Sequence, residues 1–105
     1  MEEWRTIPEC PNYEASSGGR IRNKNTHKVL AQYKAITGYM TIRLGGCNRY
    51  VHRLVCQAFH PCEMYKQYHC DHINHDKTDN RASNLRWLTR EESVRNQIHK
   101  KKDPQ

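Results

Sequence analysis

The sequence predicts an α+β domain in which a small N-terminal antiparallel sheet packs on a central helix and a ββα unit follows. Three observations lead to this prediction. Residues 1–50 contain short segments that alternate like strands between turn residues. Residues 51–59 change to the period of a helix, and residues 68–97 have the order strand, polar loop, strand and helix. We expect a β-rich module at residues 1–50 and a second module at residues 51–105, folded as one compact unit.

The N-terminal half predicts several short strands separated by turns. The clearest strand spans residues 39–44, where aromatic and β-branched residues follow Gly38. We expect residues 45–48 to form the next turn and Arg49 to begin the return strand. Further short strands are expected at residues 4–7, 13–15, 20–22 and 29–31, with the sequence Ser-Ser-Gly-Gly at 16–19 as a strong break.

Two helices are expected after residue 50. Apolar side chains at positions 51, 54, 55, 58 and 59 lie on one helical face, and Pro61 ends this helix. The second helix begins at a capping box, in which Thr89 and Glu92 can exchange hydrogen bonds with each other's backbone amides. Because only 35% of the chain is hydrophobic, the largest rings are expected in the core. These are Trp4, Tyr13, Phe59 and Trp87.

The charge predicts an anionic partner. A net charge of +7 on 105 residues makes DNA or another nucleic acid the expected partner. Basic residues recur along the N-terminal strands, and one row of them either contacts DNA phosphates or forms an ordinary solvated face. The candidate DNA-binding residues are Arg20, Arg22, Lys24, Arg43, Arg49, Arg53 and Arg86.

Composition also sets the expected compartment. No apolar run approaches the roughly 18 residues that a membrane helix needs, so no membrane association is expected. The N-terminus has no apolar signal-peptide core, and the five cysteines include no C-x-x-C pair. We therefore expect free thiols and a cytoplasmic location.

The candidate reactive pair is Asp71-His72, at the point where a strand of residues 68–72 enters a polar loop of residues 73–83. Hydrolysis of a phosphodiester needs a base that activates water, which a neutral imidazole supplies. It also needs positive charge near the phosphate, which a divalent cation held by oxygen ligands supplies. Adjacent strand residues point to opposite faces, so this pair converges on one site only if the backbone turns there.

Other polar residues surround this pair in the sequence. Asn84 precedes the returning strand of residues 85–88, where it can hold the loop or hydrogen-bond the imidazole. Ser93 and Asn96 on the capped helix could complete a metal site with Asp71. The expected metal is Mg²⁺ or Mn²⁺. A structural zinc is not expected, because the spacing of His60, Cys62, His69 and Cys70 matches no regular zinc pattern.

These motifs resemble a known nuclease family. The segments VHRLV, DHIN and NRASNLRWLT are similar to the HNH endonuclease motif of phage and intron-encoded homing endonucleases. The upstream segment EEWRTIPECPNYEASSGGRIRN resembles the small DNA-binding module that often precedes this motif. The resemblance spans roughly residues 2 to 97. It implies a ββα-metal fold, and a host cytoplasm as the location if the chain is phage-encoded.

The resemblance also implies roles for single residues. His72 would be the general base, Asp71 a metal ligand, and Asn84 the central asparagine that orients the histidine. The family's second metal ligand, commonly Asn or His, falls at Ser93, which is a departure from the pattern, and Asn96 lies one turn further along.

The resemblance predicts a metal-dependent DNA endonuclease that nicks or cuts both strands. The alternatives are a weakly active or inactive DNA-binding or regulatory protein on the same scaffold, and an effector that binds another protein. The oligomeric state is not predicted.

Overall fold

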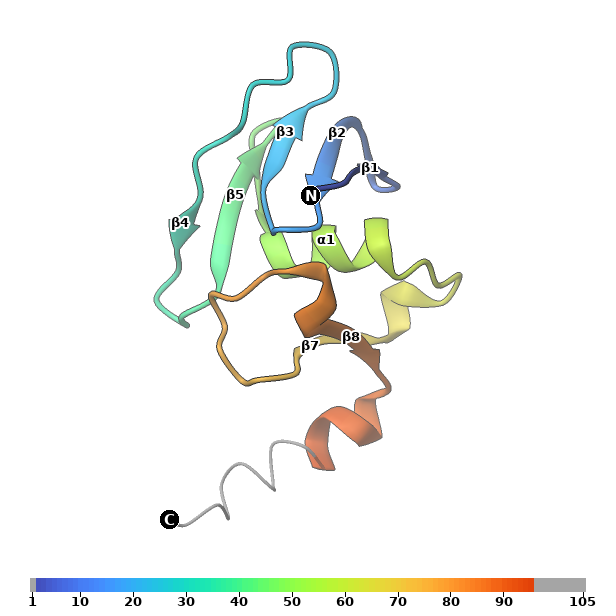
Figure 1. The fold of residues 1–105 in the computed structure, drawn as a ribbon. Helices are drawn as coiled ribbons and strands as arrows, with labels where there is room; N and C mark the ends of the chain where they lie inside the picture. Colours follow the sequence, from blue (N-terminus) through green and yellow to red (C-terminus); the bar gives the residue numbers. More distant parts are fainter. Residues whose placement is uncertain (1, 96–105) are drawn as a thin grey trace.

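The computed structural model describes residues 2–95, in which three antiparallel sheets surround one central helix (Figure 1). The helix is α1 (Val51–Phe59). The first sheet contains β1 (Trp4–Ile7), β2 (Cys10–Ser16) and β3 (Ile21–Asn23), the second contains β4 (Tyr33–Lys34), β5 (Met40–Leu44) and β6 (Cys47–Tyr50), and the third pairs β7 (His69–His72) with β8 (Leu85–Leu88). Two short 3-10 helices, η1 (Tyr65–Gln67) and η2 (Ala82–Asn84), flank the third sheet in sequence.

The predicted α+β class is confirmed, but the strands of the N-terminal half differ in detail. They form two sheets, β4 was not predicted, and the strand expected at residues 29–31 is a single bridge between Arg22 and Val29. The turn predicted at residues 45–48 was too long. Gly45 and Gly46 both have positive φ and form a two-residue hairpin turn, so Cys47 is free to pair with Leu44 in the sheet.

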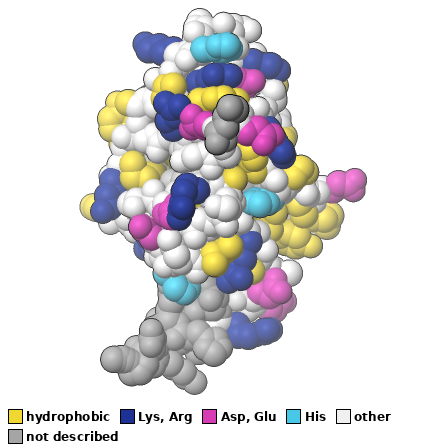
Figure 2. All heavy atoms as spheres, viewed as in Figure 1, with side chains coloured by type: hydrophobic (Ala, Val, Ile, Leu, Met, Phe, Trp, Pro, Cys, Tyr) yellow, Lys and Arg dark blue, Asp and Glu magenta, His cyan; other side chains and the backbone are white. Residues whose placement is uncertain are grey.

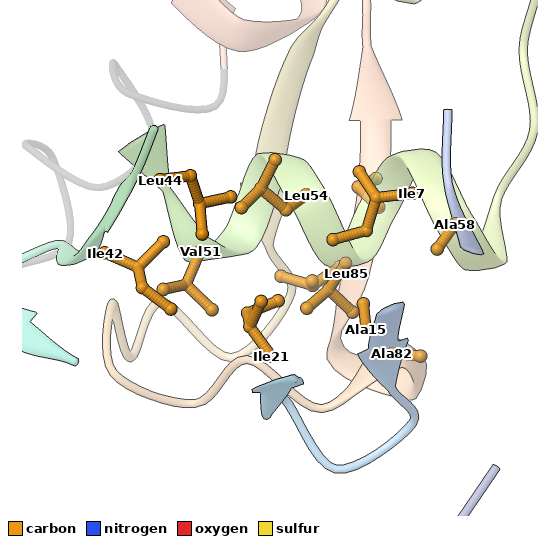
Figure 3. Packing of buried hydrophobic residues seen from close by; sticks show 12 residues of the cluster. Ile7, Ala15, Ile21, Ile42, Leu44, Val51, Leu54, Ala58, Ala82 and Leu85 are labelled. Carbon is orange, nitrogen blue, oxygen red and sulfur yellow. The ribbon is translucent and has the colours of Figure 1, made fainter. Parts of the chain in front are cut away.

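Helix α1 is the element that all three sheets share. It packs against β1 and β2, against β5 and β6, and against β7 and β8. Figure 3 shows Leu54 and Val51 of α1 among apolar side chains from each sheet, including Ile21, Ile42 and Leu85. One hydrophobic cluster therefore contains residues from both expected modules.

The prediction that the largest rings form the core was wrong. Trp4, Tyr13, Phe59 and Trp87 are only partly buried, and the core consists of aliphatic side chains, alanines and Cys56. Tyr13, Phe59 and Trp87 pack against the edge of the core, and three of the four rings lie close to a guanidinium. Arg22 lies 4.0 Å from the centre of a Trp4 ring, Arg5 4.7 Å from Phe59 and Arg53 5.3 Å from Trp87. A ring in this position keeps its face available for a guanidinium, an interaction that deep burial would prevent.

The capping box at the start of the second helix is confirmed. The Glu92 amide donates to the Thr89 hydroxyl at 3.1 Å, and the Thr89 amide donates to the Glu92 carboxylate at 2.9 Å. Residues 90–95 are helical. Asn96, expected further along this helix, lies outside the described residues. Within residues 2–95 the structure has no helix with the length and apolar character to cross a membrane.

Replacing Leu54 with alanine tests the central role of α1. Leu54 is 1% exposed, and we expect Leu54→Ala to lower the free energy of unfolding by about 2–5 kcal/mol, because a cavity would open beneath all three sheets. Urea unfolding followed by tryptophan fluorescence measures the loss. The matched control is Ile36→Ala, since the Ile36 side chain is fully exposed. Equal stability of the two variants would contradict this account of the core.

Candidate functional site

The site is built on the hairpin of β7 and β8. Their register places Asp71 opposite Arg86 and His72 opposite Leu85. The chain turns directly after His72, where the amide of Ile73 donates to the carbonyl of Asn84 at 2.8 Å. The predicted strand, loop and strand are therefore present, and the loop starts at the candidate base.

Asn84 ties the two ends of this loop together. Its side-chain oxygen accepts from the Asn74 amide at 3.1 Å. Its amide nitrogen donates to the Asn74 side-chain oxygen at 3.0 Å and to the Asp79 carbonyl at 2.9 Å. Of the two roles expected for Asn84, these contacts correspond to holding the loop.

Asp79 adds an ion pair to the same loop. Its carboxylate accepts from Arg81 Nε at 2.8 Å and Nη2 at 2.7 Å, and from the Asn74 side chain at 2.9 Å. The hydrogen bond from Arg81 is the main reason why the pKa of Asp79 lies well below its usual value. The loop is thus ordered by its own polar side chains, although most of them face solvent.

The side chain that hydrogen-bonds to the His72 imidazole is Asn80, which sequence reasoning missed. His72 is 5% exposed, and its Nε2 lies 2.7 Å from the Asn80 side-chain oxygen. An amide oxygen only accepts, so Nε2 of the neutral ring carries the hydrogen and Nδ1 carries the lone pair. No group in residues 2–95 hydrogen-bonds to Nδ1 of His72. This atom is not fully buried, unlike Nδ1 of His52.

Nothing in the sequence distinguished Asn80 from the other asparagines of the loop. Asn80 contacts His72 because the backbone of the loop turns and brings residue 80 back over residue 72. Asn80 is 5% exposed, unlike Asn74, which lies at the surface.

A second histidine packs against the first. The His52 ring of α1 lies 4.9 Å from the His72 ring and 4.9 Å from the ring of Tyr39, with which it stacks. Burial is the main cause that lowers the pKa of His52 to about 3, with the nearby His72 and Arg53 as smaller causes. The Nδ1 of His52 is buried, and none of the described residues bonds to it. His52 is therefore a neutral packing partner of His72 at physiological pH.

Asp71 lies beside His72 with its side chain 15% exposed, and its carboxylate accepts from Arg86 Nε at 3.0 Å. Residues 2–95 contain no group of three His, Cys, Asp or Glu side chains placed to hold a metal ion. A single, partly exposed carboxylate such as that of Asp71 fits a hard divalent cation that keeps water ligands and also binds substrate oxygens. Ser93 is half-buried on the capped helix, and Asn96 falls outside the described residues.

Most of the candidate DNA-binding residues have a partner within the chain. Arg20 pairs with Glu2, Arg22 with Glu14 at 2.8 Å, Arg49 with Glu9 at 3.1 Å and Arg86 with Asp71. Arg53 donates to the carbonyls of Tyr65 and Tyr68. Figure 2 accordingly shows basic and acidic side chains interspersed on one face. Lys24 and Arg43 are exposed, and neither has a side-chain partner among the described residues.

Comparison with known proteins identifies two family motifs in the chain. The HNH endonuclease profile matches residues 49–95, and the NUMOD4 motif matches residues 2–45. Residues 49–95 are therefore an HNH endonuclease domain, and a NUMOD4 motif precedes it. It is 35% identical over 102 residues to the DNA endonuclease I-HmuI of Bacillus phage SP01, which covers 91% of this chain and 58% of that protein. An uncharacterized HNH endonuclease of Acanthamoeba polyphaga mimivirus is 34% identical over 105 residues, covering 92% of this chain and 26% of the viral protein.

The fold agrees with that of a solved HNH homing endonuclease. A structure described as "DNA binding and cleavage by the HNH homing endonuclease I-HmuI" superposes with a TM-score of 0.75 at 32% identity. The match covers 98% of this chain and 62% of that one. The chain therefore spans less than two thirds of the length of these relatives.

The burial of neutral His52 predicts acid sensitivity. The pKa of His52 in the folded protein is far below the roughly 6.5 of an unfolded chain, so the unfolded state takes up the proton first as the pH falls. We expect this residue to remove about 1.4 kcal/mol of stability for each pH unit below about 6.5, until the pH nears 3. His52→Phe keeps a ring against His72 and should lack this component. Urea unfolding at pH 7.5 and pH 4.5 measures both proteins, and an equal loss in the two would contradict the prediction.

Proposed function

We propose that this chain is a metal-dependent DNA endonuclease that hydrolyses phosphodiester bonds with His72 as the general base. The observation that carries the proposal is the state of the His72 ring. Its Nε2 is engaged by Asn80, while Nδ1 has no hydrogen-bond partner in residues 2–95, and the residue before it in β7 is Asp71. The family relationship to the DNA endonuclease I-HmuI supports the same activity.

The proposed step is an attack of water on phosphorus. The Nδ1 lone pair of His72 accepts a proton from the water as its oxygen bonds to phosphorus. The bond between phosphorus and the leaving ester oxygen then breaks, and that oxygen takes up a proton from solvent. Asn80 retains the Nε2 hydrogen during the transfer, so the imidazolium that forms stays hydrogen-bonded.

The proposed metal ligands are Asp71, Ser93 and Asn96. When bound, Mg²⁺ or Mn²⁺ would neutralise charge on the phosphate and on the leaving oxygen. Arg86 would share the Asp71 carboxylate with the metal, because its Nε donates to only one of the two oxygens, Oδ2, at 3.0 Å.

DNA is the proposed partner, and all seven basic candidates remain predictions as phosphate contacts. Lys24 and Arg43 are the simplest of them, because neither has to leave a side-chain partner among the described residues. Arg20, Arg22 and Arg49 have to share or exchange a carboxylate first. A cytoplasmic location, in the host cell if the chain is phage-encoded, belongs to the same proposal.

A weakly active or inactive DNA-binding protein on this scaffold is the second candidate. Two observations favour it: the serine at position 93, where the family pattern has a stronger ligand, and the pairing of Asp71 with Arg86. Both would weaken metal binding, and apart from Arg86 the candidate DNA-binding residues would be unaffected.

Plasmid nicking separates the two functions. We expect the chain to nick supercoiled plasmid in Mg²⁺ or Mn²⁺ and to stop when EDTA is added, because the phosphate would lose its charge neutralisation. His72→Ala should abolish nicking and leave DNA binding in a gel-shift assay within about twofold. Cleavage by His72→Ala at the parent rate would overturn the general base, and DNA binding without nicking by the parent in any metal would favour the second candidate.

Position 93 gives a gain-of-function test. An amide oxygen is a better ligand for a hard cation than a serine hydroxyl, so Ser93→Asn should lower the Mn²⁺ concentration needed for half-maximal nicking by at least threefold. Ser93→Ala is the matched control and should raise it. If all three proteins have the same metal dependence, residue 93 is not a ligand.

A further inference from the structure

The turn at residues 16–19, between β2 and β3, lies directly against the loop of the candidate site. Gly19 is buried, and its φ of 95° lies in the left-handed region. A β-carbon on Gly19 would lie 2.8 Å from the carbonyl oxygen of Asn80 and 3.0 Å from its carbonyl carbon. Both are backbone atoms, so no side-chain rotation relieves that contact, and only glycine fits there.

Hydrogen bonds fix the turn and join it to the same loop. The buried Ser16 hydroxyl accepts from the amides of Gly18 at 3.2 Å and Arg20 at 2.9 Å. The Ala82 amide, two residues after Asn80, donates to the Ser17 carbonyl at 2.9 Å. The 16–19 turn therefore contacts the loop at Asn80 and again two residues later, at Ala82.

We propose that Asn80 is a positioning residue that holds His72 with its hydrogen on Nε2, and that the 16–19 turn keeps Asn80 in place through Gly19. The NUMOD4 segment would then support the proposed base directly, in addition to any contact with DNA. This inference rests on the proposed function for its effect on cleavage, but the orientation and tautomer of His72 can be measured without cleavage.

The physical reason is the choice between two neutral tautomers. An imidazole with its hydrogen on Nδ1 has no lone pair there and cannot accept a proton from water at that atom. The 2.7 Å contact to the Asn80 oxygen favours the Nε2–H form and also fixes the rotation of the ring. Displacement of the Asn80 backbone by even a few tenths of an ångström would lengthen this bond, because both residues are 95% buried.

The first test exchanges Asn80. Asn80→Leu has a similar size and no acceptor, whereas Asn80→Asp keeps an acceptor. Ring ¹⁵N chemical shifts of His72 at alkaline pH report the tautomer. We expect the Nε2–H form in the parent and in Asn80→Asp, and a mixture in Asn80→Leu. In nicking assays Asn80→Leu should lower kcat by about tenfold to a hundredfold with little change in KM, and Asn80→Asp should recover most of it.

The second test uses matched glycines. Gly46 also has a positive φ, of 85°, but a β-carbon there meets nothing within 4 Å. Gly19→Ala and Gly46→Ala therefore carry a similar backbone penalty and differ in the contact with Asn80. We expect Gly19→Ala to shift the His72 tautomer and lower kcat at least tenfold, and Gly46→Ala to do neither. If Gly19→Ala does not fold, Ala82→Pro removes the hydrogen bond to Ser17 and is expected to change His72 in the same direction.

The outcomes are distinguishable from those of the proposed function. An unchanged Nε2–H tautomer in Asn80→Leu overturns the role of Asn80. Equal tautomers and equal kcat in the two glycine variants, or an unaltered His72 in Ala82→Pro, overturn the role of the turn. A parent chain that never nicks DNA defeats the proposed function alone, because the NMR experiments still decide how His72 is held.

Discussion

The structure depends on one nine-residue helix that is buried against three sheets at once. A chain with so little apolar sequence cannot give each sheet its own core, so the sheets share one. Val51, Leu54 and Val55 are at most 1% exposed, and they meet aliphatic side chains from residues 7 to 85. This common core fixes the distance between the N-terminal strands and the hairpin that carries His72, and the contacts at the site follow from it.

Features of the fold that depend on local sequence patterns could be predicted from the sequence. The apolar period of residues 51–59 predicted α1 with its bounds, and the box at Thr89 and Glu92 predicted the start of the last helix. The division of the N-terminal strands into two sheets was not predictable, because pairing partners depend on contacts between distant segments. The half-buried tryptophans were missed for a related reason. A guanidinium becomes their neighbour only after folding.

The same distinction applies to the site. The pair at 71 and 72 and the asparagine at 84 could be found from motifs, since their spacing along the chain carries the signal. Asn80 and His52 could not be found in this way. Asn80 reaches His72 because the loop turns back over it, and His52 reaches it because α1 packs against β7. The DNA-binding role of the basic residues stays a prediction, and the carboxylate partners of four of them are a feature that composition cannot reveal.

The close approach of Gly19 to Asn80 also bears on how such proteins can be assembled by recombination. The two family motifs meet between residues 45 and 49, where a genetic joint would separate them cleanly in sequence. In the folded protein, the two segments on either side of this joint share one hydrophobic core. They also share the contact between Gly19 and Asn80, which leaves no room for a β-carbon. A nuclease segment transferred to another N-terminal segment would need a turn with glycine at the same place. The two motifs are therefore separate in sequence but share one hydrophobic core and one close backbone contact in the fold.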